Sequence, residues 1–105
     1  MTSRAAAEIL LTETVFHALA HAQRRQILLV LRYRGGEMTA GEIAERFSCS
    51  WPTTTRHLRL LERAGLVRVK KQGRERVYKL DLPKLRTTVG KWLGWFDDTQ
   101  LVHER

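Results

Sequence analysis

Cysteine and long apolar runs are scarce in this chain. Cys49 is the single cysteine among 105 residues, so one chain holds neither an internal disulfide nor a zinc site built on two or four cysteines. No apolar run approaches the roughly 18 residues of a membrane-spanning helix, and the N-terminus lacks the basic and apolar segments of a signal peptide. We therefore expect apolar packing to drive folding, and a cytoplasmic protein with no membrane partner.

Acidic side chains are also few. The chain has 11 Asp and Glu against 19 Lys and Arg, a net charge of +8, yet 43% of its residues are hydrophobic. That apolar fraction is too high for a solvated polycation, so we expect one folded domain over residues 1–105, with its core at about 12–96. Residues 50–80 carry 9 basic and 2 acidic side chains, which is +7 of the net +8. A polyanion is the natural partner of such a segment.

Apolar residues at spacings of three and four predict two helices in the first third of the chain. The first covers residues 9–20, with Thr12 or Thr14 as its cap. The second follows residues 21–23 and ends before Gly35 and Gly36, which form a strong stop signal. We expect this second helix to be short and mostly buried.

A three-residue connection separates the next two predicted helices. Thr39 and Glu42 have the spacing of a capping box and begin one helix. Ser50 caps the other, whose first turn holds Pro52 and whose end is at Gly65. Residues 48–50 between the two have the length of the turn in a helix-turn-helix.

A basic hairpin and one more helix complete the predicted fold. Two β-rich runs, over residues 66–69 and 77–80, flank a polar turn at Gly73, and Pro83 opens a final helix that reaches Phe96. The sequence therefore predicts a mainly α protein with a small β-hairpin, an α+β winged helix-turn-helix. It has five helices, and the wing lies between the fourth and the fifth.

The helix that begins after Ser50 has polar residues suited to reading DNA. The major groove of B-DNA admits one helix, whose first turns reach the base edges. Threonine hydroxyls contact phosphates or thymine methyls, and arginine binds guanine. The alternative is a cap and a solvated helix face that bind nothing. We assign base contacts to Thr53, Thr54 and Arg56, phosphate contacts to Ser50 and His57, and places in the same interface to Trp51 and Arg59.

Four cations around Gly73 extend this candidate surface. They are Lys70, Lys71, Arg74 and Arg76, and they are dense enough to neutralise several phosphates and to steepen the salt dependence of binding. The alternative is that these charges only protect an edge strand against pairing with another chain.

Three segments, in this order along the chain, resemble the ArsR family of bacterial winged-helix repressors. They are FHALAHAQRRQIL from residue 16, WPTTTRHLRLLERAGLV from residue 51 and GRERVYKL from residue 73, and the resemblance covers residues 12–96. It implies a homodimer that binds double-stranded DNA at an inverted-repeat operator and represses transcription, often of its own operon.

The metal-site residues of many ArsR members are missing here. Arsenic-type members place clustered cysteines on the third helix, where residues 41–44 of this chain include none. Zinc-type members use Asp and His on the last helix, yet residues 81–96 hold no histidine, and His103 and Glu104 lie in the polar tail. We therefore expect no cofactor and no metal at the family's usual sites. The sequence does not identify an inducer.

Other candidate ligands are weak. His17 and His21 are four residues apart, a spacing that zinc sites use, but two imidazoles make an incomplete site. Ordinary surface histidines are the alternative. Cys49 lies near a helix N-terminus, which favours the thiolate, so it is either a thiol sensor or a small buried filler.

The first and last predicted helices carry more apolar surface than a small domain hides easily. We expect them to pair with those of a second copy in an isologous dimer. The alternatives are that the tryptophans cover the core of one protomer or line a ligand pocket at the interface. The predicted interface residues are Val15, Phe16, Leu19, Val89, Trp92, Leu93, Trp95 and Phe96.

A sequence-specific DNA-binding regulator is the leading function. An enzyme is not expected, because the chain has no glycine-rich phosphate loop, no paired carboxylates and no partner to orient His57 or Cys49. The other alternative is an interaction module, in which the surface from Trp92 to Phe96 binds another protein and the affinity for DNA is non-specific. A stable homodimer occupies that surface, so the oligomeric state separates the two readings.

Overall fold

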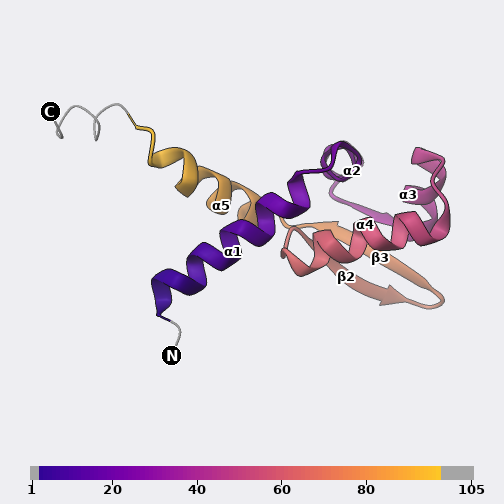
Figure 1. The fold of residues 1–105 in the computed structure, drawn as a ribbon. Helices are drawn as coiled ribbons and strands as arrows, with labels where there is room; N and C mark the ends of the chain where they lie inside the picture. Colours follow the sequence, from indigo (N-terminus) through magenta and orange to yellow (C-terminus); the bar gives the residue numbers. More distant parts are fainter. Residues whose placement is uncertain (1–2, 98–105) are drawn as a thin grey trace, which may run out of the picture.

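The computed structural model describes residues 3–97, which form a winged helix-turn-helix (Figure 1). A three-residue turn joins the third and fourth helices, and the hairpin follows the fourth. The prediction of a mainly α fold with a wing between the fourth and fifth helices is therefore confirmed. The elements are α1 (Arg4–Leu19), α2 (Ala22–Tyr33), β1 (Glu37–Thr39), α3 (Ala40–Phe47), α4 (Trp51–Arg63), β2 (Val67–Gln72), β3 (Glu75–Leu80) and α5 (Leu82–Gly94).

Helix α1 begins earlier than the apolar spacing predicts. Its cap is Ser3, whose Oγ accepts a hydrogen bond from the Ala6 amide at 3.1 Å. The predicted caps are wrong: the hydroxyls of Thr12 and Thr14 donate to carbonyls four residues earlier, inside the helix. Residues 4–8 lack an apolar stripe, but alanine is the strongest helix former, so intrinsic propensity extends the helix where periodicity gives no signal.

The predicted caps of the helix-turn-helix are confirmed. The Glu42 amide donates to Thr39 Oγ1 at 3.1 Å, and the Thr39 amide donates to Glu42 Oε1 at 2.9 Å. The hydrogen bonds from the Thr39 amide and hydroxyl lower the pKa of the Glu42 carboxyl. At the next helix, Ser50 Oγ accepts from the Thr53 amide at 3.3 Å. Local caps therefore set both ends of the turn, in which Ser48 takes the left-handed conformation with φ of 52°.

The hairpin belongs to a three-stranded antiparallel sheet in the order β1-β3-β2. Gly73, with φ of 61°, begins the two-residue loop that joins β2 to β3, a position where hairpins favour glycine. Strand β1 pairs with the other edge of β3, where Met38 lies opposite Tyr78. Strand β1 was not predicted, because its three residues are too few to show a period of two.

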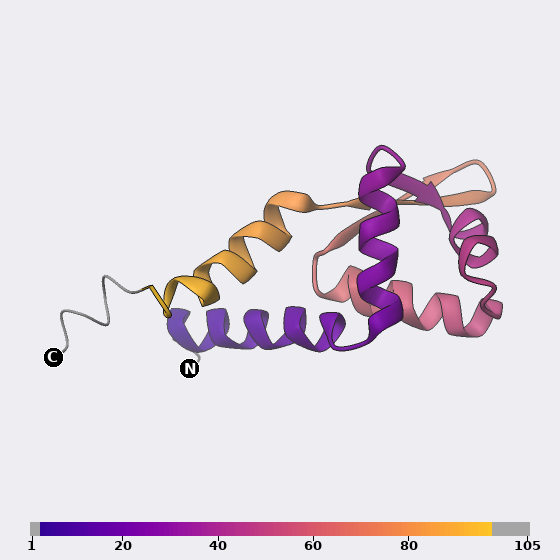
Figure 2. The same ribbon diagram turned by 90° about the horizontal axis from the view of Figure 1, so that it is seen from above.

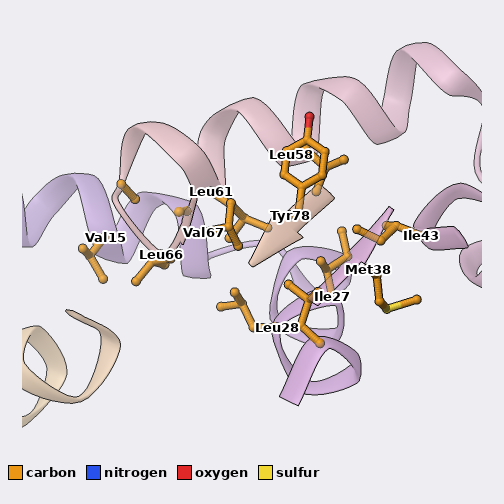
Figure 3. Packing of buried hydrophobic residues seen from close by; sticks show 13 residues of the cluster. Val15, Ile27, Leu28, Met38, Ile43, Leu58, Leu61, Leu66, Val67 and Tyr78 are labelled. Carbon is orange, nitrogen blue, oxygen red and sulfur yellow. The ribbon is translucent and has the colours of Figure 1, made fainter. Parts of the chain in front are cut away.

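The core lies between α4, α2 and the base of the sheet (Figure 3). Leu31, Leu61 and Leu66 are fully buried, and the Val15 side chain joins them from α1 with 0% exposure. The prediction that Val15 contacts a second copy is therefore wrong, because the protomer's own core already covers it. The predicted helix spacing found the apolar residues of α1 but not which of its faces meets α4.

Helices α1 and α5, named the arm below, project to one side of the body formed by the other elements (Figures 1 and 2). The molecule measures 56 × 34 × 21 Å. Its radius of gyration is 16.2 Å, against about 13 Å for a compact domain of this length. No helix within residues 3–97 has the length and apolarity needed to cross a membrane.

Candidate nucleic-acid interface

Helix α4 has a buried face and a solvent face, and two predicted DNA contacts lie on the buried one. Thr54 is 2% exposed and His57 is 5% exposed. Both lie within one turn of Leu58, and Thr54 is seven residues from Leu61, so helical geometry places all four side chains on the core side. The assignments of a base contact to Thr54 and a phosphate contact to His57 are therefore wrong.

The solvent face of α4 forms a shallow groove. Of the residues predicted to read DNA, Trp51, Arg56 and Arg59 line it. Thr55 and Arg63 also line the groove, although neither was predicted to contact DNA. Their positions were predictable, because steps of four residues from Trp51 reach Thr55, Arg59 and Arg63. Those steps mark the face away from the core leucines. The groove residues are Trp51, Pro52, Thr55, Arg56, Arg59, Leu60 and Arg63.

The N-terminus of α4 suits an anion. Ser50 is exposed, and its Oγ lies 3.0 Å from Thr53 Oγ1 while it caps the Thr53 amide. Thr53 itself is half-buried. The positive end of the α4 dipole makes this end attractive to a phosphate, and the two predicted contacts Ser50 and Thr53 stand beside it.

The four predicted cations of the wing, Lys70, Lys71, Arg74 and Arg76, are all exposed, as are Arg68 and Lys79 nearer its base. Lys71 and Arg76 are directly paired across β2 and β3, an arrangement of like charges that costs stability in a sheet. A bound polyanion would relieve that cost. Their neighbour Arg68 is different, because its guanidinium pairs with Asp81 at 3.1 Å.

Asp81 fixes the base of the wing to the arm. One of its carboxylate oxygens accepts from Arg68, and the other caps α5 by accepting from the Lys84 amide at 3.0 Å. Asp81 therefore links β2 to the N-terminal end of α5. The N-terminal end of α4 and the tip of the wing lie at the end of the molecule away from the arm (Figures 1 and 2).

His57 is packed against other basic groups. Its Nδ1 lies 3.3 Å from Nη1 of Arg24, and its ring centroid lies 4.7 Å from that of His21. Burial lowers the pKa of His57, and the positive charges of His21, Arg24 and Arg56 lower it further. Because its ring is buried against these groups, His57 is not placed to contact a phosphate.

Residues 3–97 bring no three His, Cys, Asp or Glu side chains together as metal ligands. His17 is exposed and His21 faces His57, while His103 and Glu104 lie outside the described residues. Cys49 is half-buried in the turn, where Nε2 of Gln23 donates to its Sγ at 2.6 Å. This places the thiol in a packed contact with α2.

The arm leaves most of its predicted interface residues uncovered. Trp95 is 74% exposed and Phe96 is 61% exposed, so these rings do not serve the protomer's own core. Trp92 bridges the two helices of the arm, with its ring centroid 5.1 Å from Phe16 and 5.0 Å from Phe96. Half-buried or exposed on the same two helices are Phe16, Leu19, Val89, Trp92 and Leu93, together with the unpredicted Ile9, Leu10 and Leu11.

Known proteins that are similar to this chain include helix-turn-helix proteins and transcriptional regulators. Residues 19–70 match the model of a family described as a helix-turn-helix domain. The chain is 35% identical over 83 residues to the transcriptional repressor SdpR of Bacillus subtilis. The aligned segment covers 79% of this chain and 90% of the relative.

Two solved structures are also similar. A crystal structure of an ArsR family transcriptional regulator has a TM-score of 0.78 and 30% identity, covering 100% of this chain and 99% of the other. The solution structure of a homodimeric winged helix-turn-helix DNA-binding domain from Mycobacterium bovis has a TM-score of 0.72 and 26% identity. That match covers 89% of this chain and 85% of the other.

Proposed function

Because the chain belongs to the ArsR family of winged helix-turn-helix transcriptional regulators, we propose that it binds an inverted-repeat DNA operator as a homodimer. In this proposal it represses transcription of its own or a neighbouring operon. The observation that carries the proposal is the division of the molecule into two ends. One end holds the N-terminal part of α4 and the tip of the basic wing, and the other holds the apolar arm (Figure 2).

The solvent face of α4 reads the bases in this proposal. Arg56 and Arg59 are exposed and carry the bidentate donors that recognise guanine in the major groove. Thr55 shares their groove and replaces Thr54 as the threonine placed to meet a base edge or a thymine methyl. The exposed Ser50 hydroxyl and the positive end of the α4 dipole hold a phosphate, and the wing cations hold others.

The arm forms the dimer interface in this proposal. Exposed tryptophan and phenylalanine side chains are the residues that protein interfaces favour, and a two-fold axis through the arm would present two copies of α4 to DNA. A two-fold protein requires a two-fold operator, hence an inverted repeat. The M. bovis relative is named as a homodimer and the B. subtilis relative as a repressor, which supports both assignments.

The experiment that tests the proposal is selection of bound duplexes from a random pool at near-physiological salt, followed by sequencing. Enrichment of an inverted repeat is the expected result. Enrichment of a single half-site would contradict the dimer, and binding without enrichment would contradict sequence-specific reading. A reporter gene placed behind the enriched sequence then tests repression, which requires lower expression when the protein is present.

Two substitutions separate base reading from phosphate contact. Arg56→Ala is expected to weaken binding to the enriched duplex by about 1 to 3 kcal/mol and to leave a scrambled duplex nearly unaffected. Lys71→Ala is expected to weaken both duplexes and to lower the salt slope by about one. An equal loss on every sequence for Arg56→Ala would contradict its role in reading bases.

The exposed arm also supports a second function, that of an interaction module. Its apolar side chains would then bind a different protein, and the wing would serve as a non-specific anchor on DNA. Sedimentation of the purified chain separates the two proposals, because a stable dimer buries the arm against a second copy. A monomer that enriches no duplex sequence would favour the interaction module.

A further inference from the structure

One buried guanidinium joins three helices behind the reading face of α4. Arg24, on α2, is 7% exposed. Its Nε donates to the carbonyl of Ala18 at 2.7 Å and its Nη2 to the carbonyl of His17 at 3.1 Å, both in the last turn of α1. Its remaining terminal nitrogen, Nη1, lies 3.3 Å from Nδ1 of His57 on α4. The arm and the reading helix thus share one side chain as a common partner.

We propose that Arg24 is a positioning residue for DNA recognition, which holds α4 in a fixed orientation to the arm through His57, and that protonation of His57 releases this hold. The inference rests on the proposed function, because it concerns how two copies of α4 are spaced on an operator. It assigns Arg24 and His57 a role without contact to DNA.

The contact between Arg24 and His57 depends on the protonation state of the imidazole. Every nitrogen of a guanidinium donates and none accepts, so Nδ1 of His57 must be the unprotonated, accepting nitrogen. Protonation replaces that acceptor with an N–H donor and places a second positive charge against Arg24. The hydrogen bond is then lost, and the two cations repel each other.

Within residues 3–97, every influence that shifts the pKa of His57 lowers it, so each disfavours the added charge. Arg24 and His21 face it from α2 and its N-cap, and Arg56 adds a positive charge from α4 itself. From α1, His17 contributes its carbonyl to Arg24 rather than its ring. Helix α3 and strand β2 also pack against α4, but neither supplies a charge that acts on His57. Burial and these cations lower the pKa of His57.

Loss of the contact between Arg24 and His57 would change the spacing of the two α4 helices in a dimer more than the charge of the DNA-binding surface. In a dimer built on the arm, the orientation of α4 to α1 sets the distance between the two reading helices. That distance must match half-sites one helical turn apart, about 34 Å. A loosened α4 would still bring its arginines and the wing to DNA, so affinity for an inverted repeat would fall while non-specific affinity remained.

The first test compares two neighbouring arginines. Arg25 also donates to an α1 carbonyl, that of Leu19 at 2.7 Å, but it is exposed and has no bond to α4. Arg24→Lys and Arg25→Lys both keep the charge and remove the guanidinium. Fluorescence anisotropy at pH 7.5 is expected to give a Kd for the enriched inverted repeat that rises at least about fivefold for Arg24→Lys, a usual coupling between linked sites. For Arg25→Lys the Kd for the inverted repeat is expected to stay within about twofold of the wild-type value, and the Kd for a scrambled duplex is expected to change little for either variant. Equal effects of the two substitutions would overturn the positioning role.

The second test is the pH profile, and it does not depend on the folding of Arg24→Lys. At constant salt, the wild-type Kd for the inverted repeat is expected to be higher at pH 5.5 than at pH 7.5, because 5.5 lies below the ordinary pKa of 6.5, from which burial and the neighbouring charges lower that of His57. His57→Asn keeps an accepting oxygen near the position of Nδ1 but takes up no proton, so its profile is expected to be flat. His17→Gln removes an exposed histidine as a control and is expected to follow the wild type.

The outcomes distinguish this inference from the proposed function. Exposed histidines that gain charge strengthen binding to DNA as the pH falls, which is opposite in sign to the effect expected here. Tight wild-type binding at both pH values, or identical profiles for wild type and His57→Asn, would overturn the inference and leave the proposed function standing. If the wild type prefers no duplex at pH 7.5, the proposed function fails and the positioning role falls with it.

Discussion

The substitution Thr54→Val decides which face of α4 meets DNA. Thr54 is 2% exposed, and its Oγ1 has no hydrogen-bond partner among the described residues. A buried hydroxyl without a partner costs about 1 to 3 kcal/mol. Valine has the same branched shape and nearly the same helix propensity, so it removes the cost without opening a cavity.

We expect Thr54→Val to stabilise the protein by about 1 kcal/mol, the lower end of that range. For a domain of this size such a gain raises the melting temperature by about 4 to 8 °C. Thermal unfolding followed by circular dichroism at one fixed protein concentration measures it, since the midpoint of an oligomer depends on concentration. The Kd for the inverted repeat is expected to stay unchanged, because the side chain does not reach the surface.

The neighbouring threonine provides the matched control. Thr55 is half-buried and lines the solvent-face groove of α4. Thr55→Val is therefore expected to weaken DNA binding while changing stability by less than about 0.5 kcal/mol. If Thr54→Val weakened DNA binding and left stability unchanged, Thr54 would face DNA as the sequence pattern predicted, and its placement on the core side of α4 would be wrong. A loss of stability would show that the hydroxyl is hydrogen-bonded.

Three further predictions concern the core, the arm and the capping box. Val15→Ala is expected to lower the free energy of unfolding of the protomer by about 2 kcal/mol, measured by urea unfolding. Trp95→Ala is expected to raise the dimer dissociation constant about tenfold or more, measured by sedimentation, with little effect on the folding of the protomer. The capping box is expected to weaken in acid: the folded-state pKa of Glu42 is lowered by the hydrogen bonds from Thr39, so its contribution is complete above the ordinary pKa of 4.5 and is lost as the pH falls through the folded value. Glu42→Gln should therefore show a smaller loss of stability than the wild type between pH 5.5 and 3.5, and equal losses would contradict the role of the carboxylate.

Much of the fold follows from interactions within a few residues of the chain. The capping box of Thr39 and Glu42, the Ser50 cap and the glycine turn at Gly73 each join groups no more than four residues apart. Such features are encoded locally, so a sequence pattern predicts them directly. The positive charge of the wing is predicted equally directly, because each of its cations is exposed whatever the exact geometry of the hairpin.

Other features needed partners far away in the sequence. Strand β1 exists because β3 offers a free edge some forty residues later, in the register that pairs Met38 with Tyr78. The burial of Thr54 could have been inferred from its spacing to Leu58, but the polar character of threonine and histidine argued against it. Burial of a polar side chain depends on what packs against it, and for His57 that partner is Arg24.

The order of the elements, the caps of the helix-turn-helix, the basic wing and the apolar arm follow from the amino-acid sequence, because propensity, spacing and charge are properties of neighbouring residues. The burial of Val15 and the exposure of Trp95 follow instead from the packing of the folded chain, as does the reach of Arg24 to both α1 and α4. Those outcomes depend on which helix faces meet, and the packing of distant segments sets that.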